Sequence, residues 1–241
     1  MRVLLADHEP MWREYAFSRL QSVGLDPVVV VNGERAWAVL QEKDAPRLVV
    51  MDQRIPQLNA LEICRRLRVR ADAFYTYVLL LMAVPHRGEE LLCLQSGADD
   101  CLAKPYNQDE FGARLAIAER VLAIDNRLSA INRRWRVLVD NMPFGVAAVD
   151  ARGRLKRMNT TFAQQMGYSD VKQLLGQSLQ QVVQKQSDAR SLLDEVRWGE
   201  KFDGVEVSCH GVKGKPRLLR LWGRPLPDSD EAAYEIVVQE T

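Results

Sequence analysis

Short apolar runs, spaced at intervals that suit intervening helices, constrain the first half of this chain more than any other feature. Four of these runs are clear and a fifth is less pronounced: Val3–Ala6, Val28–Val31, Leu48–Met51, Val78–Met82 and Cys101–Ala103. Runs that are apolar throughout, without alternation of polar and apolar residues, are typical of strands buried on both faces of a parallel sheet. The pattern therefore predicts a five-stranded α/β domain.

The segments between these runs carry the signals of helix ends. Pro10 fits the first turn of a helix, and Gly24 stands where a helix end often needs a positive φ. Two pairs have the spacing of a capping box: Asn59 with Glu62, and Asn107 with Glu110. Strands that alternate with helices, joined by right-handed crossovers, predict a doubly wound parallel sheet.

Charged residues follow three of the predicted strands directly. Asp7-His8-Glu9 follows the first strand, Asp52 the third and Lys104 the fifth. Ligands bind at the carboxyl ends of the strands in such a sheet, so these residues are expected to converge there. A dinucleotide-binding enzyme would instead place a glycine-rich turn after its first strand. Acids stand in that place, which disfavours a nucleotide-dependent enzyme.

Four segments carry a family resemblance in the right order and at the right separations. They are Leu5-Ala6-Asp7-His8-Glu9-Pro10, Asp52-x-x-Ile55-Pro56, Ser96-Gly97-Ala98-Asp99-Asp100 and Ala103-Lys104-Pro105-Tyr106. Together they resemble the receiver domains of bacterial two-component response regulators, which have a flavodoxin-like fold. The resemblance covers residues 1–122, which are expected to form the receiver domain.

The resemblance implies a role for each charged residue. Asp52 would accept a phosphoryl group from a histidine kinase, and Lys104 would pair with the acyl phosphate. Mg²⁺ would be held by Asp7, Asp52, Glu9 and the backbone carbonyl of Arg54. Phosphoryl transfer needs positioning and charge neutralisation, which a metal ion and a lysine can supply. The alternative is that Asp52 only caps the turn that follows its strand.

Three positions depart from the family's pattern. His8 replaces a second acid, and imidazole is a poor ligand for Mg²⁺ but a good one for zinc, copper or nickel. Weakened Mg²⁺ binding is favoured, beside a shift to Glu9, a changed metal preference or a simple hydrogen bond from His8. Met82 replaces the switch hydroxyl, and Cys101 replaces its aromatic partner. A thioether cannot donate a hydrogen bond, so the usual hydroxyl switch is not expected.

A heptad pattern connects the two halves of the chain. Its apolar positions recur in steps of four and three: Ile117, Val121, Ile124, Leu128, Ile131, Trp135 and Leu138. The repeat predicts a helical coiled-coil connector over residues 108–140 and a homodimer through residues 117–138. The alternative is one long amphipathic helix that lies on either domain.

The second half has the pattern of a small α+β domain with an antiparallel five-stranded sheet. Two strands form a hairpin, short helices follow with Ser169 as a cap, and three strands complete the order, with a turn at 211–214. This order, with Phe144-Gly145-Val146 and Asp150-x-x-Gly153, resembles a PAS sensor domain over residues 135–241. The sequence assigns no ligand to it, because PAS domains share a fold more than a ligand.

Composition narrows the possible binding partners and cellular locations. The formal net charge is +1, so nothing predicts binding to nucleic acid or to an anionic membrane surface. No apolar run approaches the roughly 20 residues of a membrane-spanning helix. The four cysteines show no CxxC spacing, which fits a reducing compartment. A cytoplasmic location is expected.

The resulting hypothesis is a signalling protein whose receiver is coupled through a dimeric helix to a PAS domain. No output catalytic motif is found, so whether the chain belongs to an enzyme stays open. The resemblance implies a diguanylate cyclase or a histidine kinase as the downstream output. The alternative is a degenerate, non-phosphorylated receiver that serves as a dimerisation scaffold for a ligand-sensing PAS domain.

Overall fold

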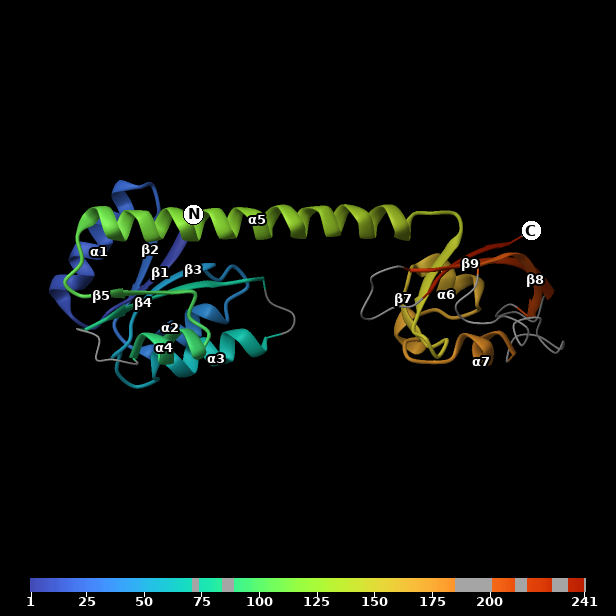
Figure 1. Ribbon diagram of the computed structural model, residues 1–241, viewed down its shortest axis with the longest axis horizontal. Helices are drawn as coiled ribbons and strands as arrows, with labels where there is room; N and C mark the ends of the chain where they lie inside the picture. The colour runs from blue at the N-terminus through green and yellow to red at the C-terminus, as the bar shows by residue number, and fades with distance from the viewer. Residues whose placement is uncertain (71–73, 84–88, 185–200, 211–215, 227–233, 241) are drawn as a thin grey trace. The chain divides into compact units, whose positions relative to one another are not determined.

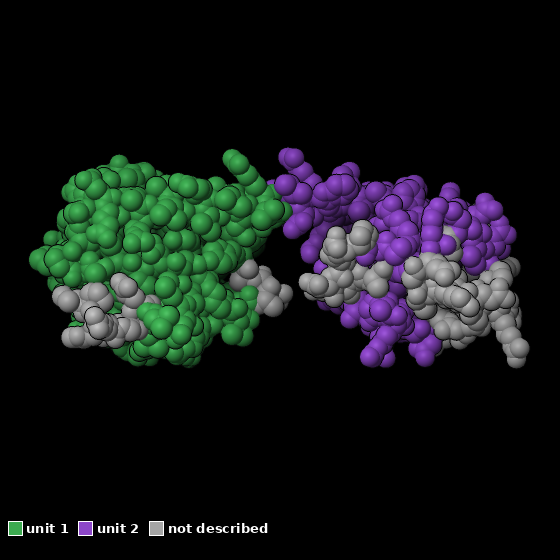
Figure 2. Space-filling model, viewed as in Figure 1, with its two compact units in different colours: residues 1–129 green, residues 130–241 purple. Residues whose placement is uncertain are grey.

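The computed structural model describes residues 1–70, 74–83, 89–184, 201–210, 216–226 and 234–240. The chain divides into two compact units, residues 1–129 and 130–241 (Figure 2). Each unit contains one five-stranded sheet. Among the described residues, no helix combines the length and the apolar character needed to cross a membrane.

The first unit contains a parallel sheet built from the predicted apolar runs. Its strands are β1 (Arg2–Ala6), β2 (Asp26–Val30), β3 (Leu48–Asp52), β4 (Tyr77–Met82) and β5 (Asp100–Ala103). Their order in the sheet is β2-β1-β3-β4-β5, the doubly wound, flavodoxin-like order. Every residue of β3 and β4 is buried, because helices cover both faces of the sheet. The predicted fold class is confirmed.

Helices lie on both faces of this sheet, as Figure 1 shows. They are α1 (Pro10–Ser22), α2 (Gly33–Leu40), α3 (Ala60–Val69), α4 (Glu89–Gln95) and α5 (Gln108–Asp140). Helices α1 and α5 form one apolar core with the sheet, and α2, α3 and α4 form the other. The predicted caps are confirmed at Asn59, which accepts from the N–H of Leu61, and at Asn107, which accepts from that of Glu110.

Helix α5 continues from the first unit into the second and has two apolar faces. One face packs in the core of the first unit through Phe111, Leu115, Ala118 and Leu122. The predicted heptad positions form a different stripe, about 100° around the helix, because Ile117 and Val121 each lie one residue before the core positions Ala118 and Leu122 and the other five continue their spacing. Six of these seven residues are between 41% and 59% exposed, and Val121 is half-buried.

The second unit contains an antiparallel sheet in the predicted order of two strands, helices and three strands. Its elements are β6 (Gly145–Val149), β7 (Leu155–Met158), α6 (Thr160–Gln165), the 3-10 helix η1 (Val171–Gln173), α7 (Leu179–Gln184), β8 (Phe202–His210), β9 (Pro216–Pro225) and β10 (Tyr234–Glu240). The sheet order is β7-β6-β10-β9-β8. Asp170, rather than Ser169, caps η1, because its side chain accepts from the N–H of Lys172. The predicted turn at 211–214 lies outside the described residues.

Candidate functional site

The charged residues predicted to converge do meet at the carboxyl edge of the parallel sheet. Asp7 follows β1, Asp52 is the last residue of β3, and Lys104 follows β5. Strand β4 separates β3 from β5, so the long side chain of Lys104 has to reach across it. All three side chains are buried.

Lys104 joins the two aspartates into one cluster. Its Nζ donates to Oδ2 of Asp7 at 2.9 Å and also to Oδ2 of Asp52. The same ammonium lies 3.5 Å from Oε1 of Glu9, whose side chain is 47% exposed. Buried charges persist only when they are paired, and this cluster provides that pairing.

Backbone N–H groups hold the second oxygen of each aspartate. The N–H of Glu9 donates to Oδ1 of Asp7 at 2.9 Å, and the N–H of Arg54 donates to Oδ1 of Asp52 at 2.6 Å. A carboxylate oxygen has two lone-pair sites, so both groups keep acceptor capacity for a metal ion. Arg54 therefore lies beside Asp52, where its carbonyl stays a predicted ligand.

Burial and pairing shift the pKa values of Asp7 and Lys104. Desolvation raises the pKa of Asp7, and the hydrogen bonds from Lys104 and from the Glu9 N–H only partly offset it. Burial alone would lower the pKa of Lys104, but its hydrogen bonds to Asp52 and Asp7 outweigh burial and raise it. Lys104 therefore stays protonated and supplies a fixed positive charge at this edge.

Four side chains could hold a metal ion here. Ligand atoms of Asp7, His8, Glu9 and Asp52 all lie within 4.8 Å of one another. The three carboxylates fit Mg²⁺, which prefers oxygen ligands, whereas the His8 imidazole does not match that preference. Receiver domains typically bind Mg²⁺, and this acidic group could bind a metal ion.

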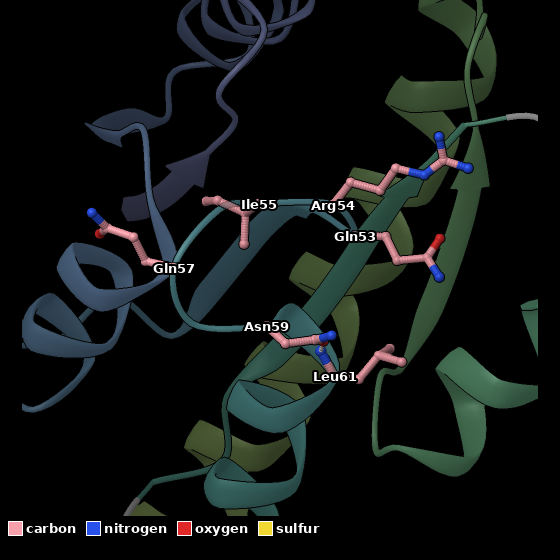
Figure 3. Close-up of a pocket in the computed structure, with 6 residues that line it drawn as sticks. All are labelled: Gln53, Arg54, Ile55, Gln57, Asn59 and Leu61. Atoms are coloured by element: carbon pink, nitrogen blue, oxygen red, sulfur yellow. Dashed lines mark hydrogen bonds between the residues drawn. The ribbon is translucent and has the colours of Figure 1, made fainter.

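A pocket of about 390 Å³ lies in the loop that follows Asp52 (Figure 3). It is lined by Gln53, Arg54, Ile55, Gln57, Asn59 and Leu61. In Figure 3 the side chains of Gln53, Arg54 and Leu61 extend to one side of the loop, and that of Gln57 extends to the other. Two of its lining residues, Gln53 and Arg54, directly follow the predicted acceptor in the chain.

Gly33, which the sequence did not single out, supports this loop. Its N–H donates to the carbonyl of Pro56 at 2.9 Å, and an added Cβ would lie 1.9 Å from the carbonyl oxygen of Leu58. Only glycine permits that approach of two backbone segments. In the sequence, the only sign of this role was a glycine directly after Asn32, the residue that caps α2.

Trp12 is a second residue that the sequence did not reveal. Its ring lies 5.7 Å from Nζ of Lys104, within the range of a cation–π contact. The ring also packs on Tyr106, with centroids 5.0 Å apart. The position of Trp12 in the first turn of α1, next to the acidic strand end, was its only signal in the sequence.

Two altered switch positions lie in neighbouring strands, Met82 as the last residue of β4 and Cys101 as the second residue of β5. Met82 is fully buried, and its Sδ accepts from the Cys93 thiol at 3.4 Å. Cys101 lies in β5 and is partly buried. No hydroxyl group occupies position 82, and a thioether cannot donate a hydrogen bond in its place.

Comparisons with known proteins agree with this arrangement. A family model described as a response regulator receiver domain matches residues 3–116, and one described as a PAS fold matches residues 133–239. The transcriptional regulatory protein TrcR of Mycobacterium tuberculosis is 37% identical over 115 residues, or 48% of this chain and 44% of TrcR. The DNA-binding response regulator MtrA of Mycolicibacterium smegmatis is 33% identical over 114 residues, or 47% of this chain and 48% of MtrA.

The chain thus spans about half the length of the curated relatives that it matches. Among solved structures, the receiver domain of the Francisella response regulator 1452 is 27% identical, with a TM-score of 0.45 over 49% of this chain and 96% of that one. The family models carry the assignment, because together they match both units. The chain contains a response regulator receiver domain followed by a PAS domain.

Proposed function

We propose that Asp52 accepts a phosphoryl group from the phosphohistidine of a histidine kinase. A carboxylate oxygen of Asp52 would attack the phosphorus atom as the phosphorus–nitrogen bond breaks, and the departing imidazole would take up a proton. The observation that carries the proposal is the pairing of Lys104 with both Asp7 and Asp52. A capping role alone would not require a buried ammonium between two acids.

Each residue of the cluster has a task in this proposal. Asp7, Asp52 and Glu9, with the carbonyl of Arg54, would hold Mg²⁺, which neutralises charge on the transferred group. Lys104 would exchange its contact with Asp52 for one with a phosphoryl oxygen. The N–H of Arg54 would keep Asp52 oriented during the attack. The pocket lined by Gln53 and Arg54, the two residues after Asp52, would admit the donor group.

Phosphoryl uptake tests this role of Asp52. The full chain is incubated with acetyl phosphate and Mg²⁺, and its intact mass is measured over time. The wild type should gain one phosphoryl group and Asp52→Asn none, whereas Asp44→Asn, at an exposed aspartate, should behave as the wild type. Lys104→Ala should slow the uptake by roughly 100-fold, as expected when one stabilising charge is lost. A wild type that gains no phosphoryl mass with any divalent ion would exclude the phosphorylation switch.

A second candidate function is a non-phosphorylated receiver that acts as a dimerisation scaffold for the PAS domain. The buried thioether of Met82 favours it, because the hydroxyl that reports phosphorylation is missing. The mass measurement separates the two candidates directly. Under this second reading, the wild type and Asp52→Asn would have the same mass after incubation.

Both candidates include a homodimer through residues 117–138. The exposed stripe on α5 supports it, because six large apolar side chains on one helix face would be covered by a second copy. A parallel coiled coil would couple the pairing of the receivers to the PAS domains. In this proposal the signal passes on to an output domain, a diguanylate cyclase or a histidine kinase.

A further inference from the structure

We propose that His8 supplies a nitrogen ligand to the cation site, so that the site binds a divalent first-row transition metal such as Mn²⁺ in preference to Mg²⁺. The inference rests on the proposed function, because it concerns the cation that serves Asp52. It differs from weakened Mg²⁺ binding, since it gives the imidazole a direct role in the site.

The position of the His8 ring supports a ligand role. A ring nitrogen lies within 4.8 Å of carboxylate oxygens from Asp7, Glu9 and Asp52, although the ring itself is exposed. Among the described residues, none forms a hydrogen bond or an ion pair with this ring; Arg13 binds only the backbone carbonyl of His8. A hydrogen bond that would hold the imidazole at the strand end is therefore not formed within the described part of the chain.

The charge of the cluster suits a divalent ion without favouring Mg²⁺. Asp7, Glu9 and Asp52 contribute three negative charges, and Lys104 offsets one of them. An acid in place of His8 would add a further negative charge. Mg²⁺ gives up its water reluctantly and depends on hard, charged oxygen ligands, so a neutral imidazole benefits it little.

The replacement of an acid by His8 should affect the binding of transition metals in the opposite direction. Imidazole is the commonest metal ligand among side chains and suits zinc, copper, iron and nickel best. Mn²⁺ is the first member of the same series and shares the preference of Mg²⁺ for carboxylates, so it is the first-row ion best matched to a site with three carboxylates and one imidazole. Mn²⁺ also takes the octahedral geometry of Mg²⁺, which leaves positions for water and a phosphoryl oxygen. Replacing an acid by His8 should therefore raise the affinity for Mn²⁺ relative to that for Mg²⁺.

Metal binding to the full chain tests this inference. Mn²⁺ is titrated into the wild type, and pulsed electron paramagnetic resonance is used to detect coupling between the bound ion and an imidazole ¹⁴N nucleus. The coupling should be present in the wild type and absent in His8→Ala and His8→Asp. It should persist in His86→Ala and His210→Ala, which remove the other two histidines of the chain.

Calorimetric affinities for Mn²⁺ and Mg²⁺ provide the second readout. The ratio of the Mn²⁺ affinity to the Mg²⁺ affinity should fall at least about tenfold in His8→Asp. Removing a residue that only hydrogen-bonds a metal ligand already lowers metal affinity about tenfold, and His8 is proposed as a ligand itself. The inference is overturned if the ¹⁴N coupling is missing from the wild type, if it survives in His8→Ala, or if the preference is the same in His8→Asp.

These outcomes are separate from the fate of the proposed function. A His8-dependent coupling in a protein that gains no phosphoryl mass would keep the metal site and reject the switch. Uptake of a phosphoryl group with Mg²⁺, without any coupling to His8, would support the phosphorylation switch and reject the His8 metal site.

Discussion

Gln57 has a φ of +71° in the loop that follows Asp52, a backbone conformation that side chains with a Cβ rarely adopt. The loop is held in place from outside, because the N–H of Gly33 binds the carbonyl of Pro56 and the backbone of Gly33 lies close against the carbonyl of Leu58. Strain of this kind persists only where the surroundings impose it, and it gathers near functional sites.

Glycine at this position should relieve the strain. A non-glycine residue in the left-handed region costs about 1–2 kcal/mol, and the extra freedom of glycine in the unfolded chain offsets about 0.4–1 kcal/mol. Gln57→Gly should therefore raise the free energy of unfolding of the receiver by about 0.5–1 kcal/mol, measured by urea denaturation of the full chain.

The matched control is Gly24, which has a φ of +78° and open space around an added Cβ. Gly24→Gln should destabilise the receiver through backbone strain alone. Equal stabilities for Gln57→Gly and the wild type would show that the loop stores no strain at this residue.

Asn159 links three elements at the point where α5 meets the PAS sheet. Its Nδ2 donates to the carbonyls of Val139 in α5 and Phe144 at 2.7 and 3.0 Å. Its Oδ1 accepts from the N–H groups of Val146 in β6 and Phe162 in α6 at 2.9 and 2.8 Å. The amide thus uses its two donors and two acceptors, and the residue is almost fully buried.

Removal of this amide should destabilise the PAS unit strongly. Asn159→Ala removes a hydrogen-bond partner from four backbone groups in or beside the core, which should cost roughly 3–5 kcal/mol in thermal or urea unfolding. Asn141→Ala is the control, because the exposed side chain of Asn141 makes one hydrogen bond among the described residues, to the carbonyl of Val137. Similar costs for the two variants would contradict a structural role for the Asn159 hydrogen bonds.

At the scale of the whole molecule, α5 is the element that both units share. Its receiver face continues past Leu122 to Asp125 and Asn126, which pair with Arg47. The exposed stripe lies on another face, so its six exposed apolar side chains stay uncovered when the helix packs on the receiver. One helix can therefore pack on its own receiver and pair with a second copy.

Charges on the stripe should separate the two copies. The double substitution of Leu128→Glu and Ile131→Glu places four like charges in the predicted seam and removes its apolar contacts, so a dimer should become a monomer. Light scattering after size exclusion measures the mass of each form. Arg133→Glu, on the far side of the heptad, should stay dimeric; a monomeric wild type would reject the coiled coil.

The sequence by itself determined both folds and the converging charges. Parallel strands buried on both faces are apolar along their whole length, so runs such as Leu48–Met51 and Val78–Met82 could be recognised as strands from the sequence. The carboxyl ends of such strands share one edge of the sheet, so the convergence of Asp7, Asp52 and Lys104 could be predicted from the sequence, and the hydrogen bonds of Lys104 show it. The helix caps at Asn59 and Asn107 depend on neighbours only two or three residues away.

Only the tertiary structure decided the contacts that join residues far apart in the chain. The approach of Gly33 to Leu58, the Trp12 ring over Lys104 and the four bonds of Asn159 leave no periodic signal. Each depends on how separate elements are placed to within a fraction of an ångström. Local preferences do not specify such distances, whereas close packing of the folded chain does.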